Sequence, residues 1–205
     1  ITLYNTDIRD YQTQVHTPDP GVNRGYLANA EKVRVRGVEF DGNIRFKDNF
    51  SLYGAFAYTD GKYVSFKNAP VPLEETGAPI AFKDISNTIL PGISKWSGSL
   101  GGEALAPGNF LGLTGRYFLG LDGYYRSSFS SSPSESKFLN IDGYALVNAR
   151  IGFRALEGVN VSLWARNLLD KDYFEQLLPA SGGAGHYAGV LGDPRTFGIT
   201  IGYAF

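Results

Sequence analysis

The side chains that could act in catalysis are few in this chain and lie far apart. Its two histidines, His16 and His186, are in separate segments, and neither has a carboxylate or a second histidine at metal-site spacing. Asp170 and Asp172 alternate along one segment and could bind calcium, but such a pair more often ends a strand or caps a turn. The serine-rich residues 127–132 lack the sharp turn that presents a nucleophile. We therefore expect no enzymatic activity, no resident metal and no cofactor.

The chain has more material for binding, because aromatic residues make up 14% of it. Aromatic side chains offer broad, rigid contact area, and an arginine can pair with an anionic ligand. We expect substrate contacts in the long connecting segments, although each such residue could instead pack loops together or meet lipopolysaccharide. The candidates are Tyr26, Phe66, Phe82, Phe129, Phe138, His186, Tyr187 and Arg195.

The elements that position these residues are predicted to be β-strands, because apolar and polar residues alternate with a period of two along most of the chain. Residues 111–125, 142–154 and 159–166 show this alternation well, whereas residues 1–15 show it poorly. The final segment is the most informative, since one of its faces is wholly apolar and ends on aromatic residues. That face comprises Phe197, Ile199, Ile201, Tyr203 and Phe205.

The connections fall into two classes that alternate along the chain. Short turns are predicted at residues 47–49, 107–109 and 157–158, which are rich in turn-forming residues. Long connections are predicted at residues 16–30, 64–93, 129–140 and 176–194. In an up-and-down sheet this alternation puts every long loop at one rim and every short turn at the other, as in outer-membrane barrels.

Composition is compatible with a membrane protein that crosses with strands. The formal net charge is −1, the chain has no cysteine and the mean hydropathy is −0.16. No run approaches the roughly 20 apolar residues of a spanning helix, but barrel strands are only half apolar and give no such run. The sequence therefore predicts an all-β fold, a transmembrane antiparallel up-and-down β-barrel with about eight strands in this chain.

The faces opposite the apolar ones carry charges of both signs. If the strands form a barrel, these residues face its lumen, and a hydrated interior without a specific partner is the simplest interpretation. The set is Glu39, Asp41, Arg45, Lys95, Glu103, Arg116, Asp122, Arg150, Arg154 and Arg166.

Several stretches resemble the C-terminal barrel region of TonB-dependent outer-membrane receptors. They include Arg-Gly-Val-Glu-Phe at 36–40, Leu-Pro-Gly-Ile-Ser-Lys-Trp at 90–96, Asn-Leu-Leu-Asp-Lys-Asp-Tyr-Phe at 167–174 and Gly-Asp-Pro-Arg-Thr-Phe-Gly at 192–198. The last two, followed by a terminal aromatic strand, form the most specific combination. The resemblance extends over essentially residues 1–205.

The resemblance implies a barrel of roughly 22 strands, plugged by a separate globular domain, that imports scarce solutes with energy from the TonB complex. Residues 1–205 then form the C-terminal third of the barrel, without the plug domain, and Ile1 lies within a strand. The implied partners are outer-membrane lipid and lipopolysaccharide, the plug domain, the remaining barrel strands, the TonB complex through the plug, and a ferric chelate. The charged set would contact the plug domain. No nucleic-acid partner is expected. The implied location is the outer membrane of a Gram-negative cell, and the final strand would be the assembly signal.

Two functions are carried forward. The first is uptake of a ferric siderophore, with cobalamin, haem or an oligosaccharide as other possible cargoes. The second is an autonomous eight-stranded outer-membrane barrel that acts as an adhesin or a lipid-modifying enzyme. A soluble β-sandwich that binds a ligand is a third, and it requires the apolar faces to pack inside a globule.

Overall fold

The computed structural model describes residues 1–16, 25–77, 79–180 and 185–204. Its main element is one antiparallel sheet in which neighbouring strands follow one another in chain order. The strands are β1 (Thr2–His16), β2 (Gly25–Phe46), β3 (Phe50–Ser65), β6 (Trp96–Phe110), β7 (Leu113–Arg126), β10 (Tyr144–Ala155), β11 (Val159–Arg166) and β14 (Thr196–Tyr203). The predicted all-β, up-and-down fold of about eight strands is confirmed, including the strand over the poorly alternating first segment.

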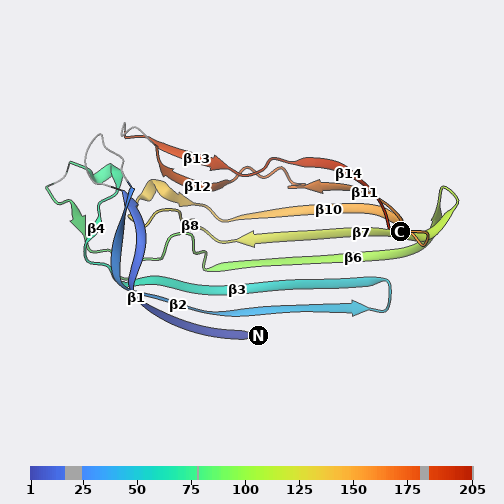
Figure 1. The fold of residues 1–205 in the computed structure, drawn as a ribbon, viewed down its shortest axis with the longest axis horizontal. Coiled ribbons are helices and arrows are strands. Elements are labelled where there is room, and N and C mark those ends of the chain that lie inside the picture. The colour runs from blue at the N-terminus through green and yellow to red at the C-terminus, as the bar shows by residue number, and fades with distance from the viewer. Residues whose placement is uncertain (17–24, 78, 181–184, 205) are drawn as a thin grey trace.

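The tight turns lie at one end of the long strands and the long loops at the other (Figure 1). Short elements occupy the loop end: β4 (Ala69–Pro70), η1 (Leu73–Glu75), β5 (Phe82–Lys83), β8 (Phe129–Ser130), η2 (Lys137–Leu139), β9 (Asn140–Ile141), β12 (Phe174–Pro179) and β13 (Tyr187–Leu191). The predicted alternation of short and long connections is therefore confirmed.

Three predicted boundaries are wrong. The last long connection, expected at residues 176–194, begins directly after Arg166, where β11 ends. The turn expected at residues 107–109 lies instead at Leu111 and Gly112, because β6 and β7 stay paired up to Phe110 and Leu113. Both turn residues have positive φ, 52° and 83°, which suits the two-residue hairpin turn that matches strand twist. The connection expected at residues 16–30 is also shorter, because β2 already begins at Gly25 and pairs there with His16.

Strand register gives the sheet one apolar and one polar face. Residues that are paired across antiparallel strands point to the same side, so Leu119, Ile151, Leu163 and Ile199 form one row across β7, β10, β11 and β14. We call the side that carries this row the apolar face. The opposite side, which carries Glu103, Gly120 and Arg150 in one row, is the polar face.

The apolar face exposes more large apolar side chains than a surface in contact with water usually does. Ile201 and Phe197 are 75% and 68% exposed, and many other large apolar side chains on this side are also exposed. A contiguous patch of this kind marks contact with lipid or another protein. Within the described residues, no helix is long and apolar enough to span a bilayer.

The main buried cluster lies on the polar side, at the loop end. Val33 of β2 and Tyr63 of β3 are paired, and both are buried against Phe66, Ile85 and Leu90 of the following connection. This connection folds back over the polar face of the strands because its apolar residues bury there. The loop end thus has a small core of its own.

If the apolar face meets lipid, we predict that Leu163→Arg on this face destabilises the protein in lipid vesicles by about 2–4 kcal/mol, because the arginine then enters hydrocarbon near the middle of the band. Ser162→Arg, one residue away on the polar face, is the matched control and should change the free energy of unfolding little. Chemical unfolding in lipid vesicles measures both. Equal costs for the two substitutions contradict a lipid-facing apolar side.

Candidate functional site

One carboxylate joins three loops that are far apart in sequence. Glu74, in η1, accepts hydrogen bonds from the Ser136 hydroxyl at 2.9 Å and 3.0 Å, and from the Lys137 backbone N–H at 3.2 Å. It also accepts one from the phenol of Tyr187 in β13. These partners belong to the β3–β6, β7–β10 and β11–β14 connections. We call Glu74, Ser136, Lys137 and Tyr187 the loop junction.

Local sequence explains how Glu74 and Ser136 are presented. Pro72 precedes η1 in an extended conformation, and a proline with fixed φ is suited to the start of a helical turn. Ser136 caps the N-terminus of η2, where its side chain accepts a hydrogen bond from the Phe138 N–H while its hydroxyl donates to Glu74. Each short helix thus places one junction residue.

The junction favours a charged Glu74 and a neutral Tyr187. Partial burial by itself raises the pKa of Glu74, but the hydrogen bonds from Tyr187, Ser136 and the backbone bring it below its ordinary value of 4.5. Burial raises the pKa of Tyr187, and its hydrogen bond to the Glu74 carboxylate raises it further. At neutral pH a phenol therefore donates to a carboxylate, which is a strong type of hydrogen bond.

Further contacts brace the same loops. The Lys83 ammonium lies 3.2 Å from Glu75 and 3.9 Å from Glu135, which belongs to the β7–β10 connection. The Ser131 hydroxyl donates to the Leu177 carbonyl at 2.7 Å and accepts from the Leu177 N–H at 3.1 Å. The Phe138 and Tyr187 rings lie 5.3 Å apart. The three loops are therefore connected at several points.

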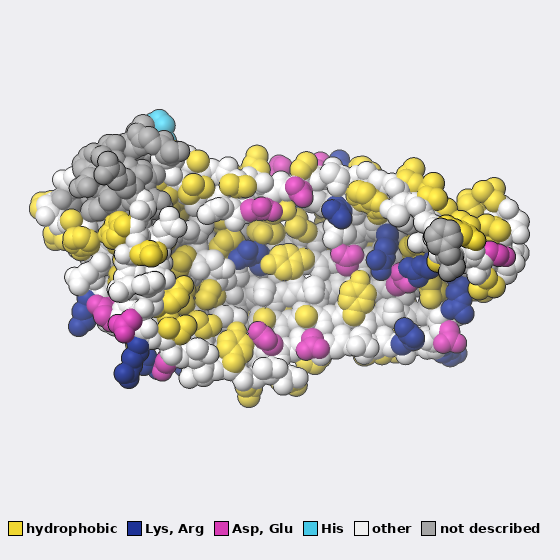
Figure 2. All heavy atoms as spheres, viewed as in Figure 1, with side chains coloured by type: hydrophobic (Ala, Val, Ile, Leu, Met, Phe, Trp, Pro, Cys, Tyr) yellow, Lys and Arg dark blue, Asp and Glu magenta, His cyan; other side chains and the backbone are white. Residues whose placement is uncertain are grey.

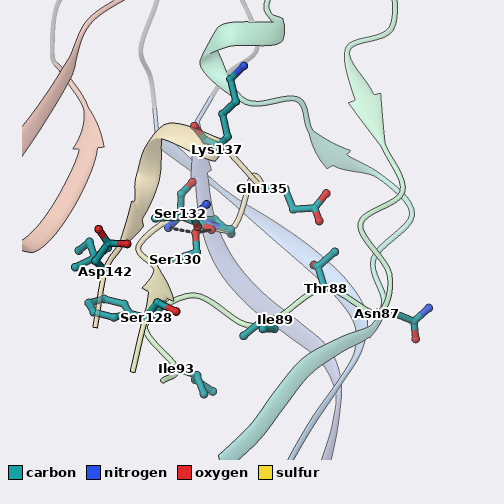
Figure 3. Close-up of a pocket in the computed structure, with 15 residues that line it drawn as sticks. Asn87, Thr88, Ile89, Ile93, Ser128, Ser130, Ser132, Glu135, Lys137 and Asp142 are labelled. Atoms are coloured by element: carbon teal, nitrogen blue, oxygen red, sulfur yellow. Dashed lines mark hydrogen bonds between the residues drawn. The ribbon is translucent and has the colours of Figure 1, made fainter. Parts of the chain in front are cut away.

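A cleft of about 730 Å³ lies between two of these loops. Asn87, Thr88 and Ile89 line one side of it, and Ser128, Ser130 and Asp142 line the other (Figure 3). Glu135 and Lys137 also line the cleft, and Lys137 is a member of the loop junction. The cleft offers hydroxyl and amide groups with a few charges, which can bind a polar ligand of moderate size.

Some of the predicted substrate contacts have exposed side chains, and others are buried. Phe138, Phe82, His186 and Arg195 are exposed, although Arg195 is also paired with Asp170 at 3.1 Å. Tyr187 belongs to the loop junction. Their role as substrate contacts remains a prediction.

Three of the predicted contacts are placed differently from the prediction. Phe66 and Phe129 are only 1% and 7% exposed, because they fill the small cores of the loop end, and of the two only Phe129 lines the cleft. Tyr26 lies in β2, paired with Val15, and not in a loop.

The predicted charged set lies on the polar face, as expected from alternation. All its members except Lys95 are in strands of the main sheet, and Lys95 directly precedes β6. On the face seen in Figure 2, acidic and basic side chains lie interspersed along the molecule. Contact of this set with a plug domain remains a prediction.

Glu103 is the centre of the strongest charge cluster on this face. Both of its oxygens accept from Arg154, at 2.7 Å and 2.9 Å, and it also pairs with Arg150 at 3.2 Å. The Arg154 guanidinium lies 4.1 Å from the centre of the Phe118 ring. Arg45 and Arg116 line a second cleft, of about 340 Å³, beside Glu103. Arginines exceed carboxylates here, so this part of the wall suits an acidic partner.

Sequence reasoning missed Glu74, Ser136 and Asn167. Glu74 bonds Ser136, which is 62 residues away in sequence, and Tyr187, which is 113 residues away. No local sequence pattern indicates such contacts. Asn167 is buried. Its side-chain NH₂ group donates to the carbonyls of Lys171 and Asp193, and its side-chain oxygen accepts from the Lys171 N–H. The quoted motif at 167–174 was the available signal for it. In the described ranges, no three His, Asp or Glu side chains form a group that could hold a metal.

Comparison with known proteins gives one family and one kind of structure. A model of the TonB dependent receptor-like β-barrel family matches residues 1–168. The chain is also similar to the ferric yersiniabactin uptake receptor of Yersinia pestis, at 18% identity and a TM-score of 0.71, over 99% of this chain and 27% of that one.

Two further structures share this fold. A siderophore receptor of Acinetobacter baumannii matches at 16% identity and a TM-score of 0.69, over 98% of this chain and 25% of that one. The ferric-catecholate import receptor of E. coli K12 matches at 20% identity and a TM-score of 0.65, over 99% and 24%. At these identities the likeness concerns the fold, and this chain spans about a quarter of each of these proteins.

We predict that Tyr187→Phe weakens the loop junction by about 1.5–3 kcal/mol, because it removes a hydrogen bond to a charged group. Hydrogen–deuterium exchange should then accelerate in η1, η2 and β13 together. Tyr117→Phe, which removes a hydroxyl bonded to the Asn109 carbonyl at the turn end, is the control and should leave the loops unchanged. Faster exchange in β13 alone contradicts a shared junction.

We also predict that Glu103→Ala destabilises the folded wall by about 1.5–3 kcal/mol, since Arg150 and Arg154 both lose their partner. Glu39→Ala on the same face is the comparison, because Glu39 has no ion pair or side-chain hydrogen bond among the described residues. Unfolding of both variants in urea measures the difference. A Glu39 variant as unstable as the Glu103 variant contradicts this assignment.

Proposed function

We propose, from the premise that this chain belongs to the TonB-dependent receptor-like β-barrel family, that it forms the C-terminal part of an outer-membrane receptor for uptake of a ferric siderophore or a similar iron complex. In this proposal residues 1–205 supply barrel wall and outer loops. A plug domain and the remaining strands complete the receptor, and the TonB complex energises it through the plug. The location is the outer membrane of a Gram-negative cell.

The observation that carries the proposal is the two-sided sheet with braced loops at one rim. An apolar band faces lipid, and the opposite face carries paired charges that suit a hydrated lumen or a plug surface. The cleft between the loops lies at the same rim, where a ligand would arrive from outside the cell. Similarity in fold to structures whose names refer to ferric siderophores supports iron complexes as the cargo.

Each part of the wall then has a role. The charged set around Glu103 contacts the plug, and its excess of arginine favours acidic residues on the plug surface. The loops around the junction form part of the outer vestibule. The final strand, with Phe197, Ile199, Ile201 and Tyr203 on the apolar face, is the assembly signal; Phe205 lies outside the described residues.

Growth measures the proposed transport directly. A strain that lacks the gene should fail to grow when one particular ferric chelate is the sole iron source, and the intact gene should restore growth only when TonB is present. The panel should also include cobalamin, haem and oligosaccharides as sole sources of the nutrient. Growth on every chelate without the gene, or rescue without TonB, contradicts the proposal.

We predict that Lys137→Ala weakens binding of an anionic ferric chelate about two- to fivefold, because Lys137 lines the cleft and an exposed ion pair contributes up to about 1 kcal/mol. Lys47→Ala, in the turn at the opposite end, is the charge-matched control and should bind normally. Titration of the membrane-reconstituted full-length receptor with the chelate measures both dissociation constants. Equal affinities place the ligand outside this cleft.

A further inference from the structure

The two walls of the cleft meet where they leave the sheet. Ile93 of the β3–β6 connection and Phe129 of β8 both line the cleft. Their segments are joined by a backbone hydrogen bond, because the Gly92 N–H donates to the Ser130 carbonyl at 2.7 Å. Ile93 and Ser128 lie at the same end of the cleft in Figure 3. The separation of the two walls at this end is therefore set within a few residues of β6 and β7.

Arg126, the last residue of β7, contacts both of these segments with one side chain. Its Nε donates to the Ser94 hydroxyl at 3.0 Å, and its Nη2 donates to the Gly92 carbonyl at 3.0 Å. The centre of its guanidinium lies 3.6 Å from the centre of the Phe129 ring, which is a stacking distance. The edge of the guanidinium thus bonds one wall of the cleft while its flat face lies on the other.

Local sequence prepares the wall that Arg126 bonds. The Ile93 N–H donates to the Leu90 carbonyl at 3.4 Å, and Gly92 has a φ of 76°. This is the pattern of a type II turn, which favours proline at its second position and glycine at its third, as in Leu-Pro-Gly-Ile at 90–93. The turn holds the Gly92 carbonyl toward Arg126 while Ile93 lines the cleft.

The contacts of Arg126 use the shape of the guanidinium more than its charge. A carbonyl, a hydroxyl and an aromatic ring are neutral partners, and within the described ranges Arg126 has no ion pair. A lysine has the same charge, but it lacks both the planar fork of donors and the flat face that stacks on a ring. The arrangement therefore requires arginine.

We propose that Arg126 is the positioning residue of the cleft. It fixes Ile93 and Phe129 relative to each other, and it thereby sets the width of the cleft at the end nearest the sheet. Arg126 does not line the cleft itself, so it acts on a ligand through these two neighbours. The inference rests on the proposed function, because it takes the cleft as the site that binds the iron chelate. A pre-formed width of this kind selects ligands by shape.

The test titrates the full-length receptor in lipid nanodiscs with two probes, an anionic ferric tris-catecholate and a neutral ferric tris-hydroxamate. Arg126→Lys keeps the charge and removes the fork and the flat face. It should weaken binding of each probe that the unmodified receptor binds by about tenfold, a typical cost of losing hydrogen bonds from a charged group. The matched control is Arg34→Lys in β2. Arg34 also donates from Nε and Nη2, to Asp7 at 2.7 Å and 3.1 Å, but on the opposite face of the sheet, so this variant should bind normally.

A purely structural role for Arg126 predicts a different result. It lowers the free energy of unfolding but leaves the dissociation constant of the folded receptor unchanged, so unfolding in urea is measured on the same samples. Unchanged affinity in the Arg126 variant, or an equal loss of affinity in the Arg34 variant, overturns the proposal. If Arg126→Lys fails to fold, Ser94→Ala removes only one of the two hydrogen bonds and should still weaken binding about threefold. No loss in this second variant also overturns the proposal.

Hydrogen–deuterium exchange of the receptor without ligand separates this proposal from the proposed transport. Arg126→Lys should accelerate exchange in residues 88–93 and 127–130 together, because one guanidinium contacts both segments. Faster exchange in only one segment overturns the role of Arg126. A receptor that binds neither probe and imports no iron complex overturns the proposed transport, and the exchange result then decides the role of Arg126 alone. A receptor that imports an iron complex but binds it equally in all variants keeps the transport and overturns that role.

Discussion

The constraint on which this structure depends is that one face of the sheet meets hydrocarbon. In hydrocarbon an unpaired backbone amide is costly, so a chain can cross only with its backbone groups bonded internally or to a neighbouring strand. The eight strands meet this constraint by pairing in chain order, each with the next. The same constraint sets the alternation of side chains, since apolar residues must point one way at every second position. The fold and the two-sided chemistry of the wall follow from it.

This constraint explains which parts were predictable from sequence. Period-two alternation identified the apolar row through Leu119, Ile151 and Leu163, and the turn-forming residues at 47–49 and 157–158 gave the short connections. The 107–109 turn was misplaced because Pro107 and Gly108 are good turn formers in general, yet here they pair with Arg116 and Gly115 within the β6–β7 ladder. Local preference was overridden by continued strand pairing.

The loops were not predictable in the same way, because their contacts are non-local. Glu74 stands in a connection with no strong pattern, and its partners come from two other connections. Phe66 and Phe129 have the composition of ligand contacts but the burial of core residues, since each loop needs its own apolar anchor. Side-chain type alone does not distinguish these two roles. The distinction depends on which surface each loop folds against.

The loop junction connects strands that the wall keeps apart. In the sheet, β3 and β11 are separated by β6, β7 and β10, so the wall itself links them only through a series of neighbours. Glu74 and Tyr187 link the connections that follow β3 and β11 directly, across the rim. A ligand that enters the cleft beside Ser136 and Lys137 therefore contacts a group of loops that share hydrogen bonds. Any displacement of η2 by the ligand must strain or break bonds to η1 and β13, because one carboxylate serves all three. Ligand binding thus affects the hydrogen bonds of three connections even when the ligand contacts only two of them.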